Sequence, residues 1–153
     1  MALDKDIAIM QSQPLLAVLP REALRLLAFS AETRVMRVGD ILFRKGDRAD
    51  GGYIVVTGLL ALDSRADGSP AVELARPGYL LGETALFTEV TRPATAIARE
   101  LSTVMKLPHK VMMRVLLEFP EAAATIRDLM AERVRGLTAE LSNVRRDLSA
   151  SDR

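Results

Sequence analysis

The stretch that decides the fold of this chain is Leu81-Gly82-Glu83-Thr84-Ala85-Leu86-Phe87-Thr88-Glu89-Val90-Thr91-Arg92-Pro93-Ala94-Thr95-Ala96. After Gly82 the residues can form one helical turn, whose first backbone N–H groups lack intrahelical acceptors and can therefore bind an anion. Arg92 adds a permanent charge, and its planar guanidinium can meet two phosphate oxygens at once. Glu83 would repel a phosphate, so we expect its carboxylate to accept a hydrogen bond from a neutral group such as a ribose hydroxyl. The stretch thus predicts a site for a small anion.

Length and composition indicate one ordinary globular domain. The chain has 153 residues, of which 49% are hydrophobic and 27% charged, and its formal net charge is +1. Such a length can bury a core without disulfides. The near-zero net charge offers no bulk attraction to nucleic acid or anionic lipid, so any anion selectivity must be local. No signal peptide or membrane span is apparent, and we expect a soluble, cytoplasmic protein.

Side chains that could support catalysis are scarce. The chain has no cysteine and one histidine, His109, which follows a proline at an expected helix start and to which we assign no role. A metal site of the cupin type needs several histidines, and a catalytic triad needs a nucleophile beside a histidine. We therefore expect neither an enzyme nor a metal cofactor.

Helical patterns open the chain and a strand-rich region follows. Residues 4–11 and 20–29 have apolar residues at helical spacing, and Pro20 occupies a first helical position. From Thr33 onward short apolar blocks alternate with glycine-containing turns, which favours a barrel or a jelly roll of two sheets. Two more strands are expected at 94–99 and 103–107, so the anion-binding stretch would form a loop on this scaffold.

The C-terminal part is predicted to be helical. We expect a helix over 109–117, a break at Phe119-Pro120, and a long helix from Pro120 to about Leu148, with residues 149–153 frayed. Gly136 weakens the long helix by about 1 kcal/mol relative to alanine. Apolar residues recur in steps of four and three, a pattern typical of a coiled-coil seam. The seam residues are Met130, Val134, Leu137, Leu141, Val144 and Leu148.

The anion-binding stretch resembles the phosphate-binding cassette of the cyclic nucleotide-binding domain family, whose pattern is Gly-Glu-x-Ala-Leu, a short gap, then Arg-x-Ala-Thr. Glu83 and Arg92 are nine residues apart, a spacing that the family uses. The turn and strand signals around the cassette extend the resemblance from about Leu15 to Pro120. They are Gly39-Asp40, Gly46-Asp47, Tyr53-Ile54, Gly58 and Gly78.

The resemblance implies a mainly β fold with flanking helices, a double-stranded β-helix or jelly roll with N-terminal helices and a long C-terminal helix. It divides the chain into an N-terminal helical segment at 1–30, a jelly roll at 31–107 with the cassette at 82–95, and C-terminal helices at 108–148 that act as lid or dimer helix. The residues implied to bind the nucleotide are Gly82, Glu83, Thr84, Ala85, Leu86, Arg92, Pro93 and Ala94. Candidates for a lid over the base are Leu129, Met130 and Arg133.

The implied function is a regulatory sensor that binds cyclic AMP or cyclic GMP and signals by movement of the C-terminal helix. Relatives selective for cyclic GMP often have threonine at the position of Pro93. The absence of threonine here favours cyclic AMP. We expect a homodimer through the C-terminal helix. No helix-turn-helix module follows Leu148, so we expect no direct DNA binding. Two alternatives stay open: a weakly binding or non-binding dimerisation module, and the sensor part of a larger channel, kinase or transcription regulator.

Overall fold

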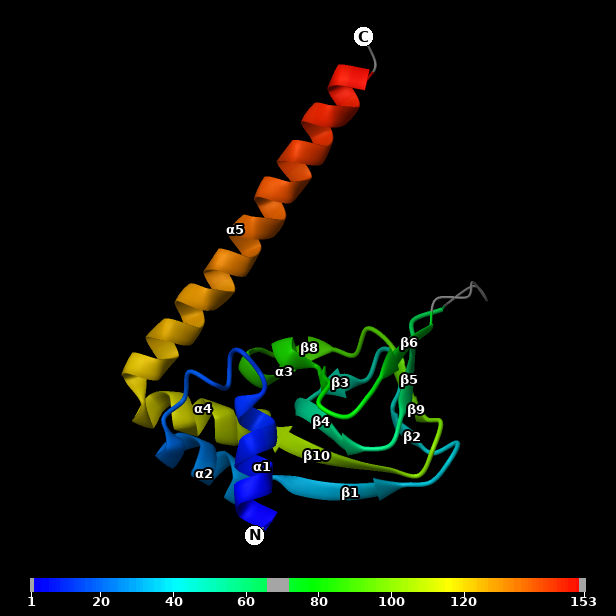
Figure 1. Ribbon diagram of the computed structural model, residues 1–153, viewed down its shortest axis with the longest axis vertical. Coiled ribbons are helices and arrows are strands. Elements are labelled where there is room, and N and C mark those ends of the chain that lie inside the picture. The colour runs from blue at the N-terminus through cyan, green and yellow to red at the C-terminus, as the bar shows by residue number, and fades with distance from the viewer. Residues whose placement is uncertain (1, 66–71, 152–153) are drawn as a thin grey trace.

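A roll of antiparallel strands, closed at one end by helices, carries one long helix that projects away from it (Figure 1). The computed structural model describes the backbone of residues 2–65 and 72–151, and the side chains of residues 3–65 and 72–136. In the described part, no helix has both the length and the apolar character needed to cross a membrane. Nor do acidic residues and histidine gather there in a group of three or more that could hold a metal ion.

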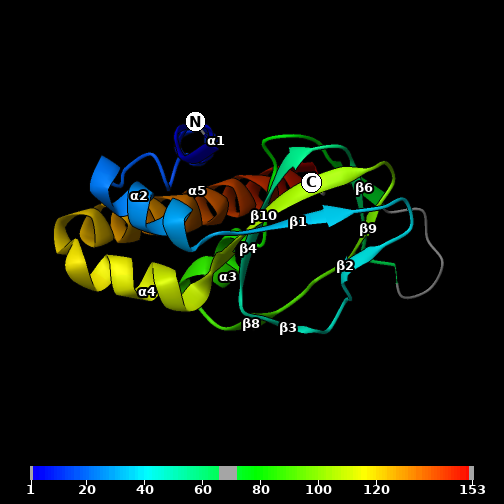
Figure 2. The ribbon, with the colours of Figure 1, turned by 90° about the horizontal axis from the view of Figure 1, so that it is seen from below.

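Two N-terminal helices pack at the helical end of the roll, beside α4 (His109–Glu118), as Figure 2 shows. They are α1 (Ala2–Gln11) and α2 (Arg21–Ser30). The predicted start of α2 at Pro20 is one residue early, because Pro20 is the N-cap and its ψ of 159° is extended. One face of α2 is buried, including Leu24 and Leu27, because its apolar residues recur at helical spacing. These leucines belong to a core cluster that also receives Ile54 from the roll and Met112 from the C-terminal part.

The strands form two facing four-stranded sheets, which confirms the predicted jelly roll. The first sheet has the order β1-β10-β4-β7 and the second the order β2-β9-β5-β6, and the paired strands run antiparallel. A second core cluster lies between them and includes Met36, Leu60 and Val104. The strands are β1 (Glu32–Met36), β2 (Ile41–Phe43), β3 (Arg48–Ala49), β4 (Gly51–Thr57), β5 (Leu60–Asp63), β6 (Val72–Ala75), β7 (Leu80–Leu81), β8 (Val90–Thr91), β9 (Thr95–Ala98) and β10 (Ser102–Pro108).

Some strand details differ from the sequence-based expectation. The short strands β7 and β8 were not predicted, because two residues are too few to show a period of two. Val35 and Val38 were assigned to an apolar strand pattern, but they are exposed by 66% and 69%. Val35 precedes Met36 on β1, and because successive side chains of a strand point to opposite faces, the burial of Met36 leaves Val35 on the outer face; Val38 lies just beyond the strand.

Two helices follow the roll, α4 (His109–Glu118) and α5 (Pro120–Ser151), and they meet at Phe119. Gly136 does not interrupt α5. The predicted end at Leu148 is too early, because α5 continues to Ser151; Asp152 and Arg153 lie outside the described residues. Of the predicted seam, the side chains of Leu137, Leu141, Val144 and Leu148 also lie outside them.

Candidate functional site

The cassette occupies the connection between β7 and β9. Gly82 follows β7 with φ 77° and ψ 45°, a left-handed conformation that a glycine adopts at little cost, and it turns the chain into α3 (Glu83–Phe87). Ala85 and Leu86 are buried, and Leu86 belongs to the core cluster between the roll and the helices. Thr84 is exposed. The apolar side of this single turn therefore anchors the cassette.

The Arg92 side chain is buried, with only 4% of its surface exposed. Its Nη2 donates a hydrogen bond to the carbonyl oxygen of Gly51 at 2.7 Å, and its guanidinium carbon lies 4.3 Å from the ring centroid of Phe43 and 5.5 Å from that of Tyr53. The aromatic faces favour the positive charge, but burial lowers the pKa of Arg92 because it removes the charge from water.

One nitrogen of Arg92 is left without an acceptor. Nη1 is buried and has no hydrogen-bond partner in the part of the chain that the structure describes. Leaving a buried donor unpaired costs about 1–3 kcal/mol, and more for a charged group. Nη1 lies against Gly82, so that a Cβ at position 82 would collide with it. The arrangement leaves a charge-bearing N–H available for an anion.

The backbone of Arg92 is held by a turn that is far away in the sequence. The Arg92 N–H donates to the Asp47 carbonyl at 2.7 Å, and the Arg92 carbonyl accepts from the Gly46 N–H at 2.8 Å. The short pair of β3 and β8, in which Arg48 faces Thr91, continues this contact. The Lys45-Gly46-Asp47 turn, seen in the sequence as a hairpin signal, thus positions the arginine.

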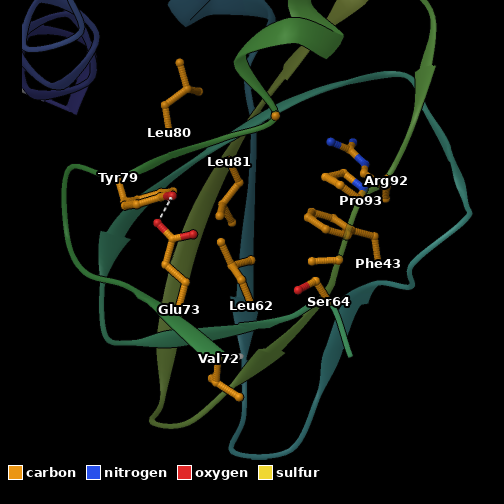
Figure 3. A pocket seen from close by; sticks show the side chains of 12 residues that line it. Phe43, Leu62, Ser64, Val72, Glu73, Tyr79, Leu80, Leu81, Arg92 and Pro93 are labelled. Atoms are coloured by element: carbon orange, nitrogen blue, oxygen red, sulfur yellow. Dashed lines mark hydrogen bonds between the residues drawn. The ribbon is translucent and has the colours of Figure 1, made fainter. Parts of the chain in front are cut away.

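A cavity of about 530 Å³ opens in front of Arg92 (Figure 3). Gly82, Arg92, Pro93 and Ala94, four of the predicted site residues, are among the residues that line it. Such a volume suits a small organic ligand. The full lining in the described part is Phe43, Leu62, Ser64, Val72, Glu73, Tyr79, Leu80, Leu81, Gly82, Arg92, Pro93 and Ala94.

The backbone donors of α3 are only partly available. The Ala85 N–H donates to the Gly82 carbonyl at 3.0 Å, closing the single helical turn. The sequence-based hypothesis had given this N–H to the phosphate, together with those of Thr84 and Leu86. The Ala85 N–H is therefore not available to a phosphate in this structure, and Ala85 contributes to the cassette through its small buried side chain.

Glu83 pairs with an arginine from the long helix. Its Oε1 accepts a hydrogen bond from Nη1 of Arg133, and the two side chains are 31% and 47% exposed. Of the three predicted lid residues, Arg133 thus reaches the cassette. Leu129 and Met130 instead are half-buried against the helical core cluster and do not line the cavity described above.

His109 contributes a contact that sequence analysis missed. Its Nδ1 donates to the carbonyl oxygen of Leu86 at 2.9 Å, and its backbone N–H donates to the Asp50 carbonyl at 2.9 Å. Because His109 begins α4, these bonds tie the cassette and the start of β4 to the C-terminal helices. The contact joins residues 23 positions apart, and no local pattern marks it.

A second polar pair lies at the end of the cavity opposite Arg92 (Figure 3). The Tyr79 hydroxyl donates to Oε1 of Glu73 at 2.6 Å. This hydrogen bond, with burial and the nearby negative charge, raises the pKa of Tyr79 to about 12. No sequence pattern marks either residue as part of a site.

We predict that Glu73→Ala returns the pKa of Tyr79 toward its ordinary value near 10, since the variant removes the carboxylate that opposes ionisation. The chain has two tyrosines, so a Tyr53→Phe background isolates Tyr79 in an ultraviolet titration. At pH 11 about one tenth of Tyr79 would be ionised with Glu73 present, and we expect a clearly larger fraction without it. Because the folded state holds this proton more tightly, the contribution to stability is complete below pH 10 and is lost as the pH rises toward 12. Circular dichroism at pH 11 checks folding, and equal ionisation in both chains would contradict the assigned hydrogen bond.

The fold and the cavity together define a class: a jelly-roll domain that presents a buried arginine to a small ligand through a short helical cassette. Residues 33–119 match the profile of the family described as "Cyclic nucleotide-binding domain". The match covers more than half of the chain. This chain therefore belongs to the cyclic nucleotide-binding domain family.

Solved structures are similar across most of the chain. The N-terminal domain of a transcriptional regulator from Streptomyces coelicolor has 29% identity and a TM-score of 0.78, covering 87% of this chain and 94% of that one. A cyclic nucleotide-binding-like protein from Brucella abortus has 38% identity and a TM-score of 0.67, covering 72% of this chain and 97% of that one.

The curated relatives are much longer. The lysophospholipase nte1 of Aspergillus fumigatus is 31% identical over 125 residues, which is 80% of this chain and 8% of that protein. The similarity thus concerns one small part of the enzyme's length.

Proposed function

We propose that this chain binds a cyclic nucleotide, with cyclic AMP preferred over cyclic GMP, and acts as a regulatory sensor whose output is movement of α5. The observation that carries the proposal is the buried Nη1 of Arg92, which has no acceptor among the described residues, on a side chain that lines the cavity. A cyclic phosphate supplies an anionic acceptor of the right size for such a donor. Family membership supports the same ligand class.

In this proposal different residues of the cassette bind different parts of the ligand. Arg92 pairs with the cyclic phosphate, and the left-handed Gly82 allows the ligand to approach the backbone. Glu83 accepts the ribose hydroxyl, because a carboxylate has enough lone pairs to serve Arg133 and the ribose together. Thr84 and Leu86 act through their main chain, while Pro93 and Ala94 form part of the wall.

The preference for cyclic AMP rests on Pro93. Pro93 is exposed and lines the cavity, yet it has neither a backbone N–H nor a side-chain hydroxyl to offer a guanine base. The resemblance places threonine at this position in relatives that favour cyclic GMP. Loss of that hydroxyl removes a guanine contact without harming an adenine.

Titration calorimetry of the purified chain with cyclic AMP and cyclic GMP tests the proposal. We expect binding of both, tighter for cyclic AMP. Absence of heat and of any ligand-induced rise in melting temperature at millimolar concentrations of either nucleotide would remove the sensor function.

The Glu83–Arg133 pair gives the ligand a physical connection to α5. A ligand shifts a helix only through a difference in affinity between two arrangements. A ribose that engages Glu83 changes the acceptor that holds Arg133, so it changes the energy of docking α5 on the cassette. His109 adds a second connection from Leu86 to α4.

We predict that Arg133→Ala uncouples α5 while largely preserving binding. Half-exposed ion pairs contribute at most about 1 kcal/mol, so the affinity for cyclic AMP should change less than about fivefold. The chain has no cysteine, so spin labels can be attached after Glu100→Cys and Arg135→Cys at two exposed positions. We expect cyclic AMP to shift the distance distribution between them in the parent and not in Arg133→Ala.

Arg127→Ala is the matched control, because Arg127 is another exposed arginine of α5. This variant should retain the ligand-induced shift. An undiminished shift in Arg133→Ala would show that the Glu83 contact does not transmit the signal.

We also infer that this chain serves as the sensor part of a larger cytoplasmic regulator, since it spans only about 8% of the curated relatives' length. Dimerisation through α5 is part of the proposal. Val134 of the predicted seam is 63% exposed, but Met130 packs within its own chain. Light scattering with and without nucleotide distinguishes a ligand-sensing dimer from a module that only dimerises.

A further inference from the structure

The lining of the cavity contains two charged groups of opposite sign. Among the described lining residues, Arg92 is the positive one and Glu73 the negative one, and the rest are apolar or neutral. Figure 3 shows the two on opposite sides of the cavity, with Leu81 and Leu62 between them. Glu73 is on β6 and Tyr79 on the segment that leads from β6 to β7.

The Glu73 carboxylate is oriented by Tyr79. Oε1 accepts a hydrogen bond from the Tyr79 hydroxyl at 2.6 Å, and a tyrosine hydroxyl is protonated at neutral pH. Figure 3 shows the second oxygen turned away from Tyr79, to the side of the cavity that holds Leu81. An ionised carboxylate oxygen can accept a hydrogen bond but cannot donate one.

A cyclic nucleotide is rigid enough for its two ends to be assigned. The phosphate is fused to the ribose, so anchoring it on Arg92 sends the base away from Arg92 and toward the opposite wall. Apolar surface from Leu62 and Leu81 lies along this path and suits the faces of a purine. The edge of the base then meets Glu73.

Resting on the cyclic-nucleotide function proposed above, we propose that Glu73 is a specificity-determining residue that reads position 6 of the purine. Its free oxygen accepts a hydrogen bond from the 6-amino group of adenine. The 6-oxo group of guanine or hypoxanthine is itself an acceptor, so a carboxylate placed against position 6, and not against the neighbouring N1–H, faces it without a proton between them. A site built to pair with one group discriminates against an analogue that leaves it unpaired.

Calorimetry of the unaltered chain with three ligands tests this first. Cyclic IMP carries the 6-oxo group without the 2-amino group of cyclic GMP, and the cyclic monophosphate of purine riboside carries only hydrogen at position 6. We expect cyclic AMP to bind at least about tenfold more tightly than cyclic IMP, and the purine riboside compound to fall between them. Equal binding of cyclic AMP and cyclic IMP overturns the role of Glu73 and leaves the sensor function standing.

The variant Glu73→Gln provides a second test, measured with the same ligands by calorimetry. Its amide keeps an oxygen for Tyr79 and can donate to a 6-oxo group, so the preference for cyclic AMP over cyclic IMP should fall about tenfold. Glu32→Gln, a change at an exposed acid on β1, is the control and should keep the parental ratio. An unchanged ratio in Glu73→Gln overturns the proposal, whereas failure of the unaltered chain to bind any of the three ligands overturns the sensor function beneath it.

Discussion

Arg92→Ala is expected to remove most of the affinity for cyclic AMP. Truncating one member of a desolvated charge pair costs about 2–5 kcal/mol, which corresponds to binding at least about 30-fold weaker. Arg92 meets the conditions for the large effect, since its side chain is 4% exposed and its Nη1 has no acceptor among the described residues. Titration calorimetry measures the loss.

Two variants distinguish the effect of the guanidinium geometry on binding from the effect of a positive charge alone. Arg92→Lys keeps the charge but cannot present two N–H groups in one plane, so we expect an intermediate affinity. Arg48→Ala removes an exposed arginine that pairs with Glu89, a similarly exposed residue of the cassette that does not line the cavity, and should bind like the parent. If Arg92→Ala binds as tightly as the parent while remaining folded, the phosphate contact has been assigned to the wrong residue.

Gly82→Ala is expected to impair both folding and binding. At φ 77° an alanine costs about 1–2 kcal/mol more than glycine, and the added Cβ collides with Nη1 of Arg92. The end of the Arg92 side chain must therefore shift from its present position, in which the guanidinium lies over the Phe43 ring. We expect a lower melting temperature and a loss of cyclic AMP affinity comparable to that of Arg92→Ala.

Gly39→Ala is the matched control for backbone strain. Gly39 has φ 91°, and a Cβ there meets nothing within 4 Å. This variant should lower the melting temperature in the same way but bind cyclic AMP normally. Equal affinities for Gly82→Ala and Gly39→Ala, measured on folded protein, would argue against the close approach of Gly82 and Arg92.

Local patterns predicted the secondary structure well where an element is long or carries its own boundary signal. Pro20 and the apolar face with Leu24 and Leu27 predicted α2, and the Phe119-Pro120 break separated α4 from α5. Two-residue strands such as β7 and β8 escaped prediction, because they exist only through pairing with β4 and β3. The exposure of Val35 likewise depends on which face of β1 packs against the core, and that face carries Met36.

The sequence by itself determined the jelly-roll class and the cassette with Gly82, Glu83 and Arg92, because these follow from residue types at short, fixed spacings. Only the tertiary structure decided what surrounds them. It placed the Gly51 carbonyl and the Phe43 ring against Arg92. It also placed Arg133 against Glu83, and Glu73 on the side of the cavity opposite Arg92. These contacts join residues from separate strands and helices, and the packing of the two sheets and α5 brings them together. The physical reason is that periodicity reports which face of an element is buried, whereas the partner of a polar group depends on how distant elements meet.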